Sequence, residues 1–230
     1  MVKQWFPFAE YEFYAFVAAG MLLIAAVDYT LAGGGLVDRA SWTIVQGVFW
    51  TIVAYLIGQV CAVPSSGLIE HIVARRVLTS PAKIQLGLST ATKIDRIVGL
   101  LFAAREFAPL SEKVRERAIR LAEAHHGCLN GSLDAEDIYQ TAFPYSRSVA
   151  DSAARLNTFM NQYGMSRNVC FVGLIATPLL TYHFYKTGTN QDLWLSIGSF
   201  VITVGMFARF VKYYSLYSME VLRTFAAKPA

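Results

Sequence analysis

The chain has 230 residues, of which 55% are hydrophobic and 16% are charged. A soluble globular domain is usually about 45–50% apolar and about 25% charged, so this composition argues against an ordinary soluble domain. The formal net charge is only +4, and acidic residues are interspersed among the basic ones, so nothing indicates a nucleic-acid-binding protein.

Most of the apolar residues gather in four long runs. Each run is close to the ~20 residues that a helix needs to cross ~30 Å of hydrocarbon, so we expect four transmembrane helices. The segment before the first run has one Lys against two Glu, which argues against a cleaved signal peptide. The predicted spans are residues 13–32, 42–63, 168–185 and 193–210; the last is apolar up to Ala208 and can lengthen through the tail.

The basic residues lie almost entirely on one side of these spans. Residues 66–167 hold most of them and the tail holds four more, whereas the two short loops on the other side hold only Arg39 and Lys186. The positive-inside rule therefore predicts that both termini and the insert are cytoplasmic. We expect a multi-pass protein of the cytoplasmic membrane, made of a hairpin (1–65), a cytoplasmic insert (66–167) and a second hairpin with a cytoplasmic C-terminal helix (168–230).

The insert has the pattern of a small helical domain. Pro64 marks the exit from the second span, and an amphipathic helix follows over residues 67–78. Further helices are expected after Ser111, after Ser132 or Asp134, and over residues 146–168. Pro144 is expected to end the helix that begins after Ser132 or Asp134. Since few alternating β runs occur, the predicted fold class is all-α, with a four-helix membrane bundle and a helical cytoplasmic insert.

The stretch "EAHHGCLNGSLDAED" (Glu123–Asp137) has the composition of a metal site. Its candidate ligands are Glu123, His125, His126 and Cys128. A di-iron site needs a second E-x-x-H copy, which the chain lacks, and neither the zinc nor the calcium-loop spacing is present. The favoured interpretation is a helix end, a turn and the start of the next helix.

Polar residues within the spans are candidate pore or intramembrane sites, because burying them in lipid is costly. Asp28 can line a water-filled vestibule or bind a cation, or it can stay hydrated near the headgroups or pair with Arg39. Gln46 and Gln59 are roughly 220° apart around a helix, so one pore cannot easily use both. Each can instead bridge helices or subunits.

Small and aromatic residues of the last span are candidate interface positions. The small residues Gly198, Gly205 and Ala208 share one face and permit close helix approach, either within the chain or between copies. The aromatic residues Tyr214 and Tyr217 belong to an interfacial belt or to a partner-docking helix. We also predict ion pairs between Glu10 or Glu12 and basic residues at similar depth: Arg75, Arg76, Arg167, Arg209 and Lys212.

No motif for a catalytic residue or a cofactor is recognisable. Phosphate-binding loops, nucleophile elbows and zincin patterns are missing from the sequence. The run Gly33–Gly35 lies between two predicted spans and is expected to form a tight turn. The three cysteines fall within spans or on the cytoplasmic side, where free thiols are the rule.

Two segments carry a resemblance. "LIEHIVARRVL" followed by "SP", and "RLNTFMNQYGMSRNVCFVGLIA", are similar to segments of uncharacterised bacterial polytopic proteins with two helices, a helical insert and two more helices. The resemblance covers about a third of the chain. It implies this architecture and a bacterial origin, and it carries no activity and no site residue.

Two classes of function fit these features. The first is a non-enzymatic, self-associating membrane protein whose cytoplasmic helices control a channel-like or membrane-perturbing region. The second is an accessory or anchoring subunit that docks a cytoplasmic or membrane partner through its insert and tail. A membrane enzyme is a weaker alternative. The lipid bilayer is the one partner common to all three.

Overall fold

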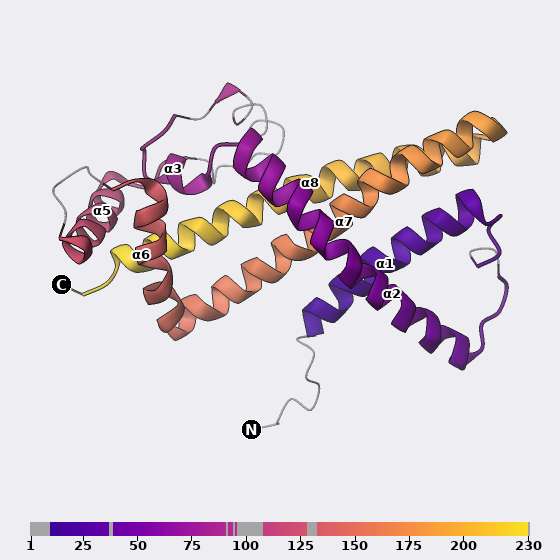
Figure 1. Ribbon diagram of the computed structural model, residues 1–230, viewed down its shortest axis with the longest axis horizontal. Helices are drawn as coiled ribbons and strands as arrows, with labels where there is room; N and C mark the ends of the chain where they lie inside the picture. Colours follow the sequence, from indigo (N-terminus) through magenta and orange to yellow (C-terminus); the bar gives the residue numbers. More distant parts are fainter. Residues whose placement is uncertain are drawn as a thin grey trace. The chain divides into compact units, whose positions relative to one another are not determined.

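The computed structural model describes residues 10–36, 39–90, 92–93, 95, 108–127 and 133–229, without the side chains of residues 10–12 and 72–77 (Figure 1). These residues form helices and no strand, which confirms the all-α class. The helices are α1 (Glu10–Leu31), α2 (Ile44–Ser65), η1 (Ser66–Val77), α3 (Pro81–Gln85), α5 (Glu112–His126), α6 (Ala135–Ser148), α7 (Ala150–Thr187) and α8 (Asn190–Ala226).

Three helices in the described part of the chain are long and apolar enough to cross a membrane. They cover Phe13–Leu31, Ile44–His71 and Asn190–Ala226, and thus coincide largely with the first, second and fourth predicted spans. Their length and composition are those of an integral membrane protein. The third apolar run lies inside α7, which is not among these three helices.

The chain divides into two compact units. Unit 1 contains Met1–Glu70 and Gly164–Phe210, and unit 2 contains His71–Tyr163 and Val211–Ala230. Most of the predicted insert, residues 71–163, therefore belongs to the same unit as the C-terminal tail. Helices α7 and α8 are each continuous, and each supplies residues to both units.

Unit 1 is built on a close crossing of α1 and α2 (Figure 1). A Cβ atom on Gly20 would lie 1.8 Å from the carbonyl oxygen of Ala54, and one on Gly58 would lie 2.0 Å from that of Phe16. Only glycine permits two backbones to come this close. Ala19 and Cys61 lie in this region and pack with Val169 and Val172 of α7.

Unit 2 has its own hydrophobic core. Buried residues of α5 and α6 pack against the last turns of α8, including Ile138, Val221 and Leu222. Two buried polar groups cross this core: Gln85 Nε2 donates to the backbone oxygen of Ser215 at 3.0 Å, and Ser146 Oγ donates to that of Val221 at 2.8 Å. The tail is thus an integral part of the helical domain formed by the insert.

Helix boundaries follow the local sequence, with two exceptions at proline. Gly127 ends α5 in the left-handed region (φ 63°), and Asp134 begins α6 with a reciprocal capping box to Asp137. The prediction that Pro144 ends a helix is wrong, because α6 continues through it to Ser148. Pro64 likewise lies inside α2, and the chain continues helically as the wider π-type helix η1.

Candidate functional site

A buried carboxylate links three helices of unit 1 at the end where α7 turns into α8. The side chain of Asp192 is 2% exposed. It accepts hydrogen bonds from the hydroxyl of Tyr29 on α1 at 2.6 Å and from the hydroxyl of Thr187 on α7. His183 Nε2 lies 3.9 Å from Asp192 Oδ2. We call Tyr29, His183, Thr187 and Asp192 the carboxylate clasp.

Asp28 has a local structural role next to this clasp. Its carboxylate accepts the backbone N–H of Leu36 at 2.8 Å, and its backbone oxygen accepts that of Gly34 at 2.9 Å. The positive φ of 78° at Gly33 and Gly34 makes this tight turn possible. Asp28 therefore closes the predicted glycine turn, and Arg39 instead lies over the ring of Trp42, 5.8 Å from its centroid.

The two glutamines of the second span also have partners on their own helix. Gln46 forms the capping box of α2: its side chain accepts the N–H of Thr43, and its own N–H donates to Thr43 Oγ1. Gln59 Nε2 donates to the hydroxyl of Tyr55 at 3.0 Å. Asp28, Gln46 and Gln59 thus do not converge on a common polar path within one chain.

A second polar seam joins α2 and η1 to α7 within unit 1. Ser65 Oγ donates to Asn168 Oδ1 at 2.7 Å, and both side chains are fully or nearly fully buried. Arg167 Nη1 pairs with Glu70 Oε2 at 2.7 Å, and each of these two side chains is 15% exposed. Arg167 was expected to pair with Glu10 or Glu12, whose side chains, like those of Arg75 and Arg76, lie outside the described residues.

Hydroxyl groups connect α7 to α8 along their antiparallel contact. Thr177 hydrogen-bonds to Ser199 at 2.9 Å, and Thr181 to Ser196 at 2.7 Å. Farther along, a Cβ atom on Gly173 would lie 2.1 Å from Thr203 Oγ1. The polar residues that dilute the third apolar run are therefore satisfied by partners inside unit 1.

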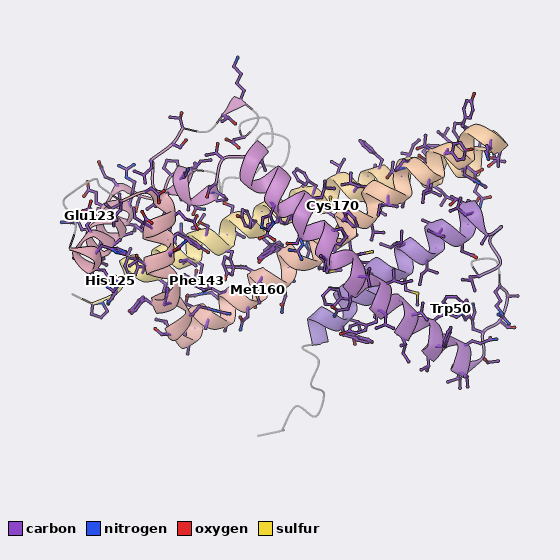
Figure 2. The ribbon with its side chains drawn as sticks, in the orientation of Figure 1. Trp50, Glu123, His125, Phe143, Met160 and Cys170 are labelled. Carbon is purple, nitrogen blue, oxygen red and sulfur yellow. The ribbon has the colours of Figure 1, made fainter. Side chains whose placement is uncertain are left out.

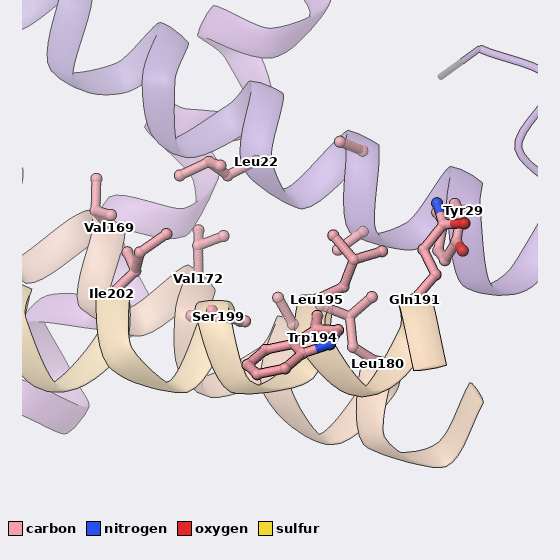
Figure 3. Close-up of a pocket in the computed structure, with 15 residues that line it drawn as sticks. Leu22, Tyr29, Val169, Val172, Leu180, Gln191, Trp194, Leu195, Ser199 and Ile202 are labelled. Atoms are coloured by element: carbon pink, nitrogen blue, oxygen red, sulfur yellow. The ribbon is translucent and has the colours of Figure 1, made fainter. Parts of the chain in front are cut away.

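Between α1 and the α7–α8 pair lies an apolar cleft of about 410 Å³ (Figure 3). Leu22 of α1 faces Val169 and Val172 of α7, and Leu195 and Ile202 of α8 complete the wall. Tyr29 and Gln191 lie together at one end of the cleft, beside the carboxylate clasp, whereas Val169 and Ile202 lie at the other end. The cleft thus has one polar end and a long apolar body.

The candidate metal ligands lie in unit 2. Glu123 on α5 is buried, whereas His125 and His126 at the end of the same helix are exposed (Figure 2). His126 Nε2 lies 2.8 Å from Thr141 Oγ1 on α6. The described residues contain no group of three His, Cys, Asp or Glu side chains that could hold a metal ion, and Cys128 lies outside them.

The candidate interface residues of α8 fall into two sets. An added Cβ on Gly198 or Gly205 would meet no atom of another described element within 4 Å, so neither glycine is a point of close helix approach among the described residues. Ala208 is half-buried. Tyr214 and Tyr217 each meet the ring of Tyr163 edge-on at 6.0 Å, and so pack inside unit 2.

Besides Gly173 of α7, small residues that bring helices together are found on α1 and α2. Ala54, Gly58, Cys61 and Ser65 are the buried residues of α2, and their spacing of four, three and four places them on one helix face. This small-residue pattern is visible in the sequence, and it could have indicated the close crossing of α2 with another helix. The partners of Asp192 could not be read in the same way, because Tyr29 is 163 residues away.

Comparison with known proteins gives no match to a protein-family model, to a curated protein or to a solved structure. The functional argument therefore rests on the chain's own residues.

Proposed function

We propose that this chain is a four-span protein of the bacterial cytoplasmic membrane that anchors a helical domain on the cytoplasmic side. The domain is unit 2, built from the insert and the tail. In this proposal the protein is an accessory or anchoring subunit, and unit 2 docks a partner protein.

This proposal also places the third predicted span, residues 168–185 of α7, in the membrane. Only Gly188 and Thr189 separate α7 from α8, and the Thr177–Ser199 and Thr181–Ser196 hydrogen bonds fix the two helices side by side. If α8 crosses the bilayer, the adjacent part of α7 has to lie at the same depth. The polar groups of this segment do not oppose that placement, because their hydrogen bonds are made within unit 1.

The observation that carries the anchoring role is the shared core of the insert and the tail. Ile138 of α6 and Val221, Leu222 and Phe225 of α8 are all buried in it. A flexible loop between spans would not bury such a core. A folded domain held by two continuous helices, α7 and α8, is suited to present a defined surface to another protein.

A channel-like homo-oligomer is the second candidate, and Gln59 is the residue that favours it. Gln59 is exposed on α2 among exposed apolar residues such as Leu56, Val60 and Val63. An amide on a lipid-facing surface is well placed to hydrogen-bond to a neighbouring copy. Against a pore, Asp28 and Gln46 are already engaged in a turn and a helix cap.

Mass determination of the intact assembly in mild detergent separates the two candidates. The anchoring proposal predicts one copy of this chain, held in fixed proportion with a different polypeptide when purified from its native membrane. A closed ring of identical copies that dissociates on Gln59→Leu substitution would instead support the channel-like assembly. As a matched control, Gln46→Leu alters a helix cap and leaves the exposed α2 face unchanged.

A further inference from the structure

We propose that the cleft between α1, α7 and α8 binds one acyl chain of a bilayer phospholipid, with the headgroup at the polar end near Tyr29 and Gln191. This inference rests on the proposed membrane placement of unit 1. It adds a specific lipid site to the anchoring function.

The wall of the cleft has the chemistry of an acyl-chain site. Its body is formed by aliphatic side chains from all three helices, including Leu22, Val172, Leu180, Leu195 and Ile202. The hydroxyl of Ser199, which also lines the cleft, is already hydrogen-bonded to Thr177. The body of the cleft therefore offers water few hydrogen-bond partners and favours a hydrocarbon occupant.

Apart from Ser199 and Trp194, the polar side chains that line the cleft lie at one end. Tyr29 and Gln191 lie there together (Figure 3), at the level where α7 turns into α8 and where α1 ends. Trp194 is 69% exposed and lines the cleft one helical turn from Gln191. Tyr and Trp residues typically lie at the headgroup level of a bilayer. An amphiphile with its tail in the body and its headgroup at this end matches both parts of the cleft.

The lining of the cleft suits a lipid tail. It comes from α1, α7 and α8, and it runs from Val169 and Ile202 at one end to Tyr29 and Gln191 at the other (Figure 3). A thin hydrocarbon chain can extend along the whole cleft and contact all three helices.

Gly198 and Gly205 provide a matched pair of variants for a test. Both glycines lie on α8, seven residues apart and on the same face, and an added Cβ meets no atom within 4 Å at either position. Only Gly198 lines the cleft. Gly198→Leu therefore fills the cleft, whereas Gly205→Leu adds the same side chain outside it.

The probe is a phosphatidylcholine with a photoactivatable diazirine in one acyl chain, mixed into vesicles of phosphatidylethanolamine and phosphatidylglycerol that contain the full chain. We expect the wild type and Gly205→Leu to be labelled at residues 22–29 and 191–202, and Gly198→Leu to lose this labelling severalfold. Native mass spectrometry should show one retained phospholipid per chain in the first two proteins and none in the third.

Equal labelling of both variants, or labelling spread evenly over exposed α2 residues, would overturn the lipid site. A thermal melt of each variant shows whether Gly198→Leu is folded, and Gly198→Ile is the substitute if it is not. Alkaline carbonate extraction of the wild type distinguishes failure of the proposed membrane placement from failure of the proposed lipid site. Release from the membrane contradicts the membrane placement itself, whereas retention with no site-specific labelling contradicts only the lipid site.

Discussion

The hydroxyl of Tyr29 donates to Oδ1 of Asp192 at 2.6 Å, although the two residues are 163 positions apart in the chain. This bond joins the end of α1 to the start of α8 and closes the polar end of the apolar cleft. Since the Asp192 side chain is almost fully buried, its hydrogen bonds decide whether the carboxylate is tolerated there.

Tyr29→Phe removes this bond and keeps the aromatic ring. We expect a loss of about 1–3 kcal/mol, because a buried acceptor loses one of its donors. Thermal unfolding in a mild detergent measures the change. Tyr14→Phe is the control: Tyr14 lies on the same helix, is 67% exposed, and should leave the melting temperature unchanged. Equal stability of the two variants would show that the clasp does not hold α1.

The Glu70–Arg167 pair should stabilise unit 1 far more than the Arg155–Glu220 pair stabilises unit 2. Both side chains of the first pair are 15% exposed, whereas Arg155 is 59% exposed. We expect Glu70→Gln to cost about 1–3 kcal/mol, since the guanidinium stays partly buried without its partner. Arg155→Met should cost less than about 1 kcal/mol.

A double-mutant cycle with Glu70→Gln and Arg167→Met measures the coupling of the buried pair directly. The account predicts a clear coupling energy that persists in high salt, because partly buried charges are weakly screened. Additive effects of the two substitutions would mean that the pair contributes nothing specific.

Much of the secondary structure follows from local sequence, and the exceptions have a physical cause. The cap at Asp134 and the left-handed end at Gly127 were both predictable, because each depends only on neighbouring residues. The end expected at Pro144 was wrong, because a helix can continue through a proline where the surrounding packing tolerates the loss of one helix hydrogen bond.

The candidate site was less predictable, because its contacts are long-range. Asp28, Gln46 and Gln59 were selected as polar residues in apolar runs, yet the side chain of each has a hydrogen-bond partner in its own helix, cap or turn. Asp192 was not selected, since it lies just before the predicted fourth span and reads as a solvated turn residue. Its importance depends on Tyr29, which no local pattern connects to it.

Alanine at Gly58 should disrupt the crossing of α1 and α2. The added Cβ would lie 2.0 Å from the backbone oxygen of Phe16, and the helices have to separate to make room. We expect a loss of about 1–3 kcal/mol. Gly47→Ala on the same helix meets no atom within 4 Å and should be neutral or slightly stabilising. If the two variants melt at the same temperature, the close crossing is not needed for the fold.

The stability of unit 2 should depend on pH through the carboxyl group of Asp95, which is 1% exposed. Burial alone raises the pKa of its carboxyl group, but hydrogen bonds from Thr79 and Thr92 outweigh burial and lower that pKa below its ordinary value of 3.8. A lowered folded-state pKa contributes stability above the unfolded-state pKa and loses it as the pH falls through the folded-state pKa.

Asp95→Asn should therefore destabilise the protein at neutral pH, and the difference from wild type should shrink as the pH falls below about 4. Melting curves from neutral to acidic pH measure this convergence. Asp151→Asn, at an exposed position in the same unit, provides the control with no expected change. If the loss of stability caused by Asp95→Asn does not vary with pH, Asp95 acts through its shape and not through its charge.

The central claim is that four segments cross the membrane, and protease access to inserted tags tests it most directly. Short protease-cleavable tags are placed at the Gly34 turn, at the Gly188 turn and after Ala230, and protease is added to intact spheroplasts. The account predicts cleavage at Gly34 and Gly188 from outside, and cleavage after Ala230 only when the membrane is broken. If the Gly188 tag, like the C-terminal tag, is cleaved only after lysis, the claim that four segments cross the membrane is contradicted.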